Sequence, residues 1–221
     1  RIYIGEDRIN NAVYISPLNL HKEEADVVVD FASPKAADHL MDFCAEKKLG
    51  LVLCTTGLSE EQIKKVKETA EKTAVLRSAN MSLGVNLLLK LVQEAAKVLA
   101  SSGFDIEIVE KHHNQKKDAP SGTALALADS MNEALGDQYH YVYDRSSVHE
   151  KRDPKEIGIA SVRGGSIVGD HDVIFAGKDE VITFNHTAYS KAIFAKGALE
   201  AAKFLAGKEP GLYDMSDVVQ L

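Results

Sequence analysis

Cysteine is scarce in this chain, which has only Cys44 and Cys54 among its 221 residues. Their spacing matches none of the paired motifs that hold zinc, and both lie in apolar or helical contexts. The eight histidines offer no better ligand set, because the adjacent His112 and His113 are poorly placed to share an ion and the others lack ligand spacing. We therefore expect two reduced core thiols, no metal site and a cytoplasmic protein.

Basic runs and long apolar runs are also missing. The formal net charge is -7 and no stretch concentrates Lys and Arg, so we expect no nucleic-acid partner. The longest apolar stretch, residues 83–100, carries Asn, Lys, Gln and Glu at intervals, which indicates a buried amphipathic helix instead of a membrane span. No leading apolar segment resembles a signal peptide, and we expect no membrane partner.

The chain also lacks the G-x-G-x-x-G turn with which a dinucleotide-binding fold normally begins. Its opening residues, 1–8, read like the end of a second strand, where Asp7 would hold a ribose diol and Arg8 would reach a 2′-phosphate. A charged turn explains these two residues equally well. If the first βα unit is absent, the pyrophosphate has no cradle, and we expect weak cofactor binding or none.

What the first third does contain is an alternation of short apolar runs with helical patterns, as in the βαβ units of a parallel sheet. Strands are predicted at residues 25–31, 50–57 and 73–80. Helices are predicted at residues 34–47 and directly after Ser59, which has the side chain of a helix N-cap.

After the helix at residues 83–100 the pattern changes, because strands now follow one another and predict a mixed or antiparallel sheet. A hairpin is expected at residues 177–179, a helix at 121–135, a long surface loop at 137–154 and a last helix at 191–205 before a Gly/Pro tail. We therefore predict an α/β protein: a Rossmann-like domain, apparently without its first βα unit, and an α+β domain with a mixed sheet. The predicted boundaries are 1–82 with 192–221 for the dinucleotide-binding domain and 83–191 for the substrate domain, whose exposed sheet face is a natural subunit interface.

Small polar residues follow three successive strands of the predicted parallel sheet. Ligands bind beyond the carboxyl ends of such strands, so this set fits a dinucleotide lying across the sheet edge. Ordinary turn chemistry favours the same residue types and remains an alternative. The candidate cofactor contacts are Phe31, Cys54, Thr55, Thr56, Ser78, Ala79, Asn80 and Met81.

The stretch EKHHNQKKDAPSGTA, residues 110–124, gathers cations against the start of a helix. His112 and His113 end a strand and point to opposite sides, and Lys116 can curl back toward His112. Ser121, Gly122 and Thr123 would then open a helix whose free amides attract an anion. A small dicarboxylate suits such a pocket, although an ordinary helix cap with solvated His and Lys side chains is the simpler alternative.

Three further features follow this stretch. Arg163 before two glycines could line a carboxylate pocket or belong to a surface hairpin, and residues 168–171, VGDH, are a second candidate. Lys191 is either a carboxylate partner or a helix-start cation. Ser121 lacks the G-x-S-x-G context of a nucleophile, so covalent catalysis is not expected.

The whole stretch 110–124 resembles the signature E-x-H-H-x-x-K-x-D-A-P-S-G-T-A of the 4-hydroxy-tetrahydrodipicolinate (dihydrodipicolinate) reductase family of bacterial lysine and diaminopimelate synthesis, and it matches every fixed position. Further matches are VVDFASP, CTTGLSEEQ, SANMSLGVN, SVRGGSIVGDH and GLYDMSDVV. The resemblance extends from about residue 25 to residue 219.

The resemblance implies an enzyme in which NADH or NADPH reduces a cyclic unsaturated dicarboxylate, formed when the 4-hydroxy compound loses water, and a protein acid supplies the proton. It implies that His112 is the catalytic histidine and Lys116 the proton donor, with substrate contacts from His113, Ser121, Gly122 and Thr123. It also implies a homotetramer that assembles through the second-domain sheets. The chain departs from many members at Cys54, where they have Gly, and at Lys191, where they have Arg.

Two other functions fit parts of the sequence. An amino-acid dehydrogenase of the homoserine or aspartate type would share the broad fold, but the DAPSGT turn speaks against it. A non-catalytic remnant that binds dicarboxylates or mediates oligomerisation would follow from the missing phosphate loop.

Overall fold

The computed structural model describes residues 25–219, so Asp7 and Arg8 lie outside the described residues. The chain divides into two compact units. The described part of the first comprises residues 25–83 and 194–219, and the second comprises residues 84–193. Each unit has its own sheet and its own apolar core.

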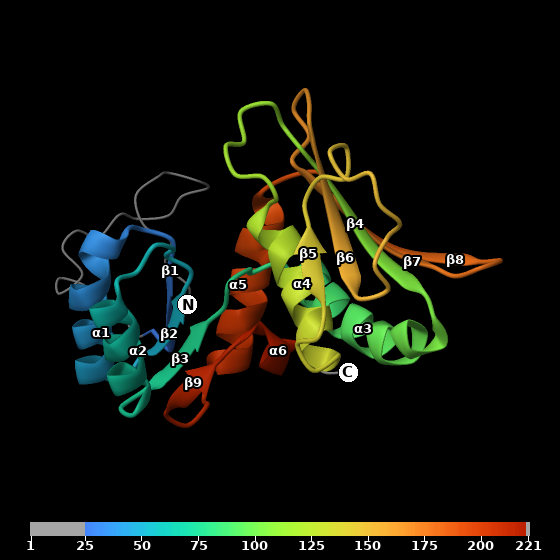
Figure 1. The fold of residues 1–221 in the computed structure, drawn as a ribbon. Coiled ribbons are helices and arrows are strands. Elements are labelled where there is room, and N and C mark those ends of the chain that lie inside the picture. The colour runs from blue at the N-terminus through green and yellow to red at the C-terminus, as the bar shows by residue number, and fades with distance from the viewer. Residues whose placement is uncertain (1–24, 220–221) are drawn as a thin grey trace. The chain divides into compact units, whose positions relative to one another are not determined.

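The first unit contains a four-stranded parallel sheet in the order β1-β2-β3-β9. Helices α1 and α2 pack on one face and α5 on the other (Figure 1), so the sheet is buried on both sides. This confirms the predicted α/β class. The elements are β1 (Val27–Asp30), α1 (Pro34–Lys47), β2 (Gly50–Leu53), α2 (Glu60–Ala70), β3 (Ala74–Arg77), α5 (Ala192–Leu205), β9 (Gly211–Tyr213) and α6 (Met215–Val218).

The start of α2 follows from its sequence. Ser59 Oγ accepts a hydrogen bond from the Gln62 amide, and Gln62 Oε1 accepts one from the Ser59 amide, which completes a capping box. Gln62 Nε2 then donates to Asp38 Oδ2 at 2.8 Å, so the same cap connects α2 to α1.

The prediction of a Gly/Pro tail after the last helix was wrong in part, because this segment contains β9 and α6.

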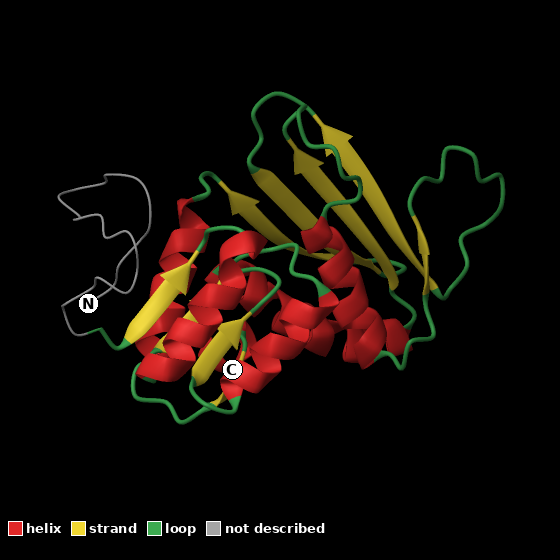
Figure 2. Ribbon diagram, turned by 90° about the vertical axis from the view of Figure 1, so that its left-hand side faces the viewer, coloured by secondary structure: helices red, strands yellow, loops and turns green. Residues whose placement is uncertain are grey.

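The second unit contains a five-stranded mixed sheet in the order β5-β6-β4-β7-β8. Strand β4 pairs parallel with β6 and antiparallel with β7, as the succession of strands predicted. Helices α3 and α4 cover one face of this sheet (Figure 2). The elements are α3 (Leu83–Leu99), a 3-10 turn (Ala100–Ser102), β4 (Asp105–His112), α4 (Gly122–Ala134), β5 (His140–Val142), β6 (Glu156–Arg163), β7 (Gly169–Ala176) and β8 (Val181–Ala188).

The predicted loop at residues 137–154 was wrong in one respect, because it contains β5, which pairs with β6. Three residues are too few to show the alternation of period two by which a strand is identified, so β5 could not be predicted from the sequence.

Strand β4 alternates between its two faces along its whole length. Ile106 and Ile108 join the apolar core, and the next two residues on that face are Glu110 and His112. The buried face of the sheet therefore changes from apolar to ionisable at the carboxyl end of β4.

Gly197 in α5 provides a test of the packing in the first unit. A Cβ at this position would lie 1.7 Å from the Met81 carbonyl oxygen, so Gly197→Ala must displace the backbone. We expect the free energy of unfolding to fall by about 2 kcal/mol or more, measured by urea denaturation. Lys196→Ala, at the exposed neighbouring position, should change it by less than about 0.5 kcal/mol. Equal stability of the two variants would contradict this account.

Candidate functional site

The second unit has a fully buried carboxylate, that of Glu110, at the end of β4. Its Oε2 accepts hydrogen bonds from His112 Nδ1 at 2.6 Å and from Arg163 NH1 at 2.8 Å. Its Oε1 accepts from the Ser121 amide at 3.0 Å and from Arg163 NH2 at 2.7 Å. Each carboxylate oxygen thus receives at least two donors, and the donors come from β4, β6 and the start of α4.

These contacts keep Glu110 ionised. Burial alone raises the pKa of this carboxyl, but hydrogen bonds from Arg163, Ser161 and His112 outweigh burial and lower the pKa to about 2. The hydrogen bond with Glu110 in turn raises the pKa of the Arg163 guanidinium. Arg163 NH2 also donates to the Asp118 carbonyl at 2.6 Å, so NH1 and NH2 are occupied by the protein's own oxygens, whereas the buried Nε has no hydrogen-bond partner.

An ionised Glu110 determines which nitrogen of His112 carries hydrogen. A carboxylate can only accept, so His112 Nδ1 must donate to it, and Nε2 of the neutral ring is left with a lone pair. Nε2 lies over Gly169, where an added Cβ would come within 3.1 Å of it. Residue 169 is thus a glycine at the point where a side chain would crowd the imidazole.

Helix α4 starts beside the same carboxylate. Ser121 is the N-cap, as predicted, and its Oγ accepts a hydrogen bond from the Ala124 amide at 3.1 Å. Ser121 is buried, Gly122 is exposed and Thr123 is half-buried. The helix start is therefore exposed to solvent at Gly122, whereas the Ser121 side chain is buried and caps the helix.

His171 is the last residue of the candidate segment 168–171, and the structure places it beside Glu110 and His112. It lies on β7 directly opposite Glu110, is 4% exposed, and its Nε2 is 2.9 Å from Ser121 Oγ. Its ring meets that of His112 edge to face, with the centroids 5.1 Å apart. Burial is the main cause that lowers the pKa of His171 to about 4, and a proton on both nitrogens of the neighbouring His112 would act in the same direction. The VGDH segment therefore contributes to the site through its histidine.

The other members of the central stretch are more exposed. Lys116 Nζ forms an ion pair with Asp118 Oδ1 at 2.8 Å, and the two side chains are 20% and 58% exposed. The Lys116 amide donates to the His113 carbonyl, so the chain turns back on itself after β4. His113 directly follows β4 and is half-buried.

The first unit has its own buried carboxylate at a strand end. Asp30, the last residue of β1, accepts from Thr55 Oγ1 at 2.5 Å and from the Ala32 amide at 3.0 Å. It thereby joins the loops that follow β1 and β2. Thr55 is buried by this contact, whereas Thr56 is exposed and Phe31 is 49% exposed.

The third strand end is similar in layout. Asn80 Oδ1 accepts from the Ser82 amide at 2.8 Å, Ala79 is exposed, and the Met81 side chain lies in the core.

Both cysteines have free thiols, and Cys54 is half-buried whereas Cys44 is buried. Burial, with the nearby charge of Asp30, raises the pKa of both thiols to about 12. Thiolate chemistry is therefore disfavoured at both positions.

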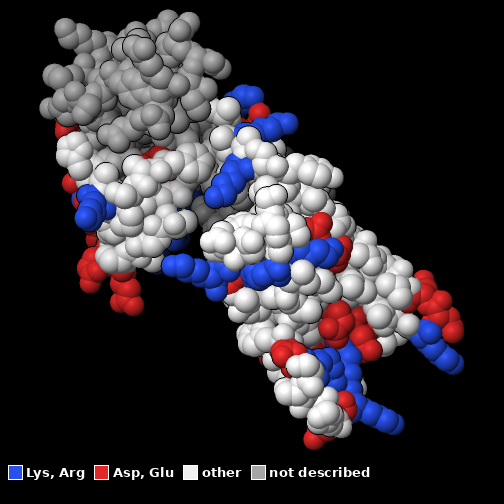
Figure 3. Space-filling view, turned by 90° about the horizontal axis from the view of Figure 1, so that it is seen from above, with Lys and Arg blue, Asp and Glu red and all other residues white. Residues whose placement is uncertain are grey.

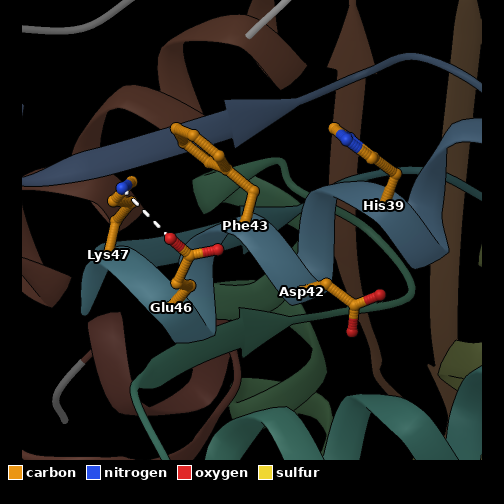
Figure 4. A pocket seen from close by; sticks show the side chains of 5 residues that line it. All are labelled: His39, Asp42, Phe43, Glu46 and Lys47. Atoms are coloured by element: carbon orange, nitrogen blue, oxygen red, sulfur yellow. Dashed lines mark ion pairs between the residues drawn. The ribbon is translucent and has the colours of Figure 1, made fainter. Parts of the chain in front are cut away.

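A pocket of about 330 Å³ lies on the outer side of α1. Figure 4 shows its lining side chains, all from this one helix, with an ion pair of 3.1 Å between Lys47 and Glu46. The lining residues are His39, Asp42, Phe43, Glu46 and Lys47, and they include none of the predicted site residues.

Residues 25–219 hold no group of three or more side chains able to bind a metal, and no helix long and apolar enough to cross a bilayer. On the face seen in Figure 3, acidic and basic side chains are interspersed over the described surface.

Comparison with known proteins gives one consistent family. Residues 3–81 match the family model for the N-terminus of dihydrodipicolinate reductase, and residues 84–219 match the model for its C-terminus. The 4-hydroxy-tetrahydrodipicolinate reductase of Caldanaerobacter subterraneus subsp. tengcongensis is 58% identical over 93% of this chain and 81% of its own length. The Clostridium tetani reductase of the same name is 51% identical over 97% of this chain and 85% of its own.

A solved structure agrees with the sequence relatives. Dihydrodipicolinate reductase from Paenisporosarcina sp. TG-14, with dipicolinate bound, superposes with a TM-score of 0.72 at 25% identity. The match covers 88% of this chain and 74% of that one.

The buried ring of His171 predicts a pH-dependent contribution to stability. The unfolded chain binds this proton near pH 6.5, whereas the folded protein resists it until about pH 4. Stability is therefore lost as the pH falls through this window, by up to roughly 3 kcal/mol from this group. His171→Gln retains a hydrogen-bonding group but cannot titrate, so its free energy of unfolding should fall less between about pH 7 and pH 4 in urea denaturation.

His140→Gln, at an exposed position, is the control and should retain the wild-type pH dependence. If His171→Gln also retains it, His171 is not held neutral by the fold.

Proposed function

The chain belongs to the dihydrodipicolinate reductase family, and from this premise we propose which of its residues bind substrate and cofactor and which move a proton. The enzyme is a 4-hydroxy-tetrahydrodipicolinate reductase, an oxidoreductase of lysine and diaminopimelate synthesis. The observation that carries the assignment of roles is the Glu110–His112 contact beside the N-terminus of α4. It puts a proton-carrying ring next to a helix start suited to anions.

His112 and Lys116 are the proposed proton-handling groups. The Nε2 of His112 is free of the Glu110 contact and lies where residue 169 has no side chain. Lys116 carries three donor hydrogens on a flexible stem, and its pairing with the largely exposed Asp118 is of a kind that contributes little to stability. A bound anion can therefore draw Lys116 away from Asp118, which leaves the ammonium placed as a general acid.

The proposed substrate is a small cyclic dicarboxylate. One carboxylate would meet the first turn of α4, where Gly122 is exposed and Thr123 is half-buried. His113 would supply further polar contact. Ser121 acts indirectly, because its hydroxyl is already shared by Ala124 and His171. The dipicolinate in the Paenisporosarcina reductase supports this substrate class.

The cofactor is a pyridine nucleotide, and the proposed contacts are the exposed residues at the three strand ends. Thr56, Phe31 and Ala79 present accessible surface, whereas Thr55 and Met81 are internal and would only hold the loops in shape. Cys54, Ser78 and Asn80 are intermediate in exposure. When bound, NADH or NADPH supplies the hydride.

We further infer a homotetramer in the cytoplasm. The face of the second sheet opposite α3 and α4 presents both charged and apolar side chains, among them Lys111, Val162 and Val181. Such a face could pair with another copy of the sheet. The two free thiols support a reducing compartment.

Two substitutions test the proton-handling roles. His112→Asn retains a donor toward Glu110, and Lys116→Met retains the aliphatic stem, so neither should unfold the protein. Each should lower kcat by about 100-fold or more, because positioned acids and bases contribute roughly 10²- to 10⁴-fold. Turnover is measured as nucleotide oxidation with 4-hydroxy-tetrahydrodipicolinate as substrate.

Lys117→Met, at the exposed neighbouring lysine, is the matched control and should remain within about twofold of wild type. Normal turnover in both test variants would overturn the assignment of roles.

Thr56→Ala tests the cofactor contacts. Loss of one hydrogen bond should weaken NADH or NADPH binding about fivefold in calorimetric titrations, which also show which nucleotide is preferred. Binding of pyridine-2,6-dicarboxylate, which the second unit should hold, serves as the internal control and should not change. Unchanged nucleotide affinity would contradict the contact.

A further inference from the structure

We propose that Glu110 is a positioning residue. Its carboxylate determines which ring nitrogen of His112 carries the hydrogen, and it holds the imidazole at a fixed distance from the start of α4. The inference rests on the proposed function of His112. The buried Glu110 carboxylate binds the proposed catalytic residue, His112, through one oxygen and the backbone amide of Ser121, at the start of α4, through the other.

The donor count requires a carboxylate at this position. His112 Nδ1 and Arg163 NH1 donate to one oxygen, and the Ser121 amide and Arg163 NH2 donate to the other. An amide side chain has one acceptor oxygen and one NH2 group, so it could satisfy only one of these pairs. The NH2 group of a glutamine would then face donors in a site with no exposure to water.

The tautomer of His112 depends on this choice. With a carboxylate beside Nδ1, the hydrogen stays on Nδ1 and Nε2 keeps its lone pair. The Ser121 amide can only donate, whereas His112 Nδ1 can change from donor to acceptor, so a glutamine would turn its oxygen toward Ser121 and its NH2 group toward Nδ1. Nδ1 must then accept, and the hydrogen moves to Nε2. Nε2 would change from acceptor to donor, although the shape of the side chain at position 110 would hardly change.

Glu110 also connects three segments that are separate in the sequence. It is hydrogen-bonded to His112, two residues away, to Ser121, eleven residues away, and to Arg163, fifty-three residues away. A single carboxylate therefore sets the distance between the imidazole and the helix start. Small displacements of this kind affect rate strongly, because a shift of about 1 Å can cost roughly 100-fold.

A purely structural ion pair would look different, and strand β4 offers one for comparison. Glu107 pairs with Arg152 at 2.7 Å, but their side chains are 33% and 17% exposed, and Arg152 is shared with Asp105. Glu107 lies on the other face of the strand, away from His112. Glu107→Gln is therefore the same chemical change at an arginine-paired glutamate three positions away.

The experiment compares Glu110→Gln with Glu107→Gln. Nitrogen-15 NMR of protein labelled at histidine reports which ring nitrogen carries hydrogen, and the His112 signals are assigned by their loss in His112→Asn. We expect Nδ1–H in wild type and Glu107→Gln, and Nε2–H in Glu110→Gln. In Glu110→Gln, kcat should fall by about 10- to 10⁴-fold, with a much smaller change in KM, since a carboxylate-to-amide change beside a catalytic histidine costs about 10⁴-fold in serine-protease triads.

Destabilisation is controlled with a double variant. Glu110→Gln/Arg163→Met removes the guanidinium that would confront the new NH2 group, so it should recover stability but not the wild-type tautomer or kcat. If the double variant recovers both stability and kcat, Glu110 is merely structural and the proposal fails. An unchanged His112 tautomer in Glu110→Gln also overturns it. A wild-type protein that shows the predicted tautomer without reductase turnover would contradict the proposed function and leave the Glu110–His112 coupling standing.

Discussion

The ion pair between Glu110 and Arg163 is the contact on which the second unit's site depends. Burying an isolated carboxylate costs several kcal/mol, and only a matched cation with good geometry offsets this cost. The bidentate pairing supplies that geometry and leaves room at each oxygen for one more donor. His112 and the Ser121 amide fill those places. Removing Arg163 would leave the carboxylate of Glu110 buried without a cation, so Glu110 depends on Arg163.

Both units use the same device at a strand end. In the first unit Asp30 closes β1 and accepts hydrogen bonds from Thr55 and Ala32, which shapes the loops after β1 and β2. In the second unit Glu110 does the same for the turn into α4. Loops have few apolar contacts to hold them, so an internal acceptor at the sheet edge gives them a fixed shape. The exposed residues beside each acceptor are then free to contact a ligand.

Much of the fold could be predicted because local signals agreed with one another. Ser59 and Ser121 are N-cap residues that mark the starts of α2 and α4. The alternation of residue types along β4 correctly predicted a strand whose side chains alternate between two faces. Strands β5 and β9 were missed because three residues carry no measurable period. The contacts of Arg163 and His171 could not be predicted for another reason. Both lie more than 45 residues from Glu110 in sequence and reach it only through the register of β6 and β7. A pattern within one strand contains no information about that register.

The register of β4 also keeps two sets of charges apart. Lys111 lies between Glu110 and His112 in sequence but points to the opposite face, where it bonds Asp170 and Asp172 at 2.8 Å each. These contacts join β4 to β7 on the face away from the helices. A slip of one residue would bring Lys111 to the buried face and move Glu110 and His112 out of it. The Lys111 contacts therefore oppose such a slip, and the charges on the open face help to keep Glu110 and His112 on the buried face.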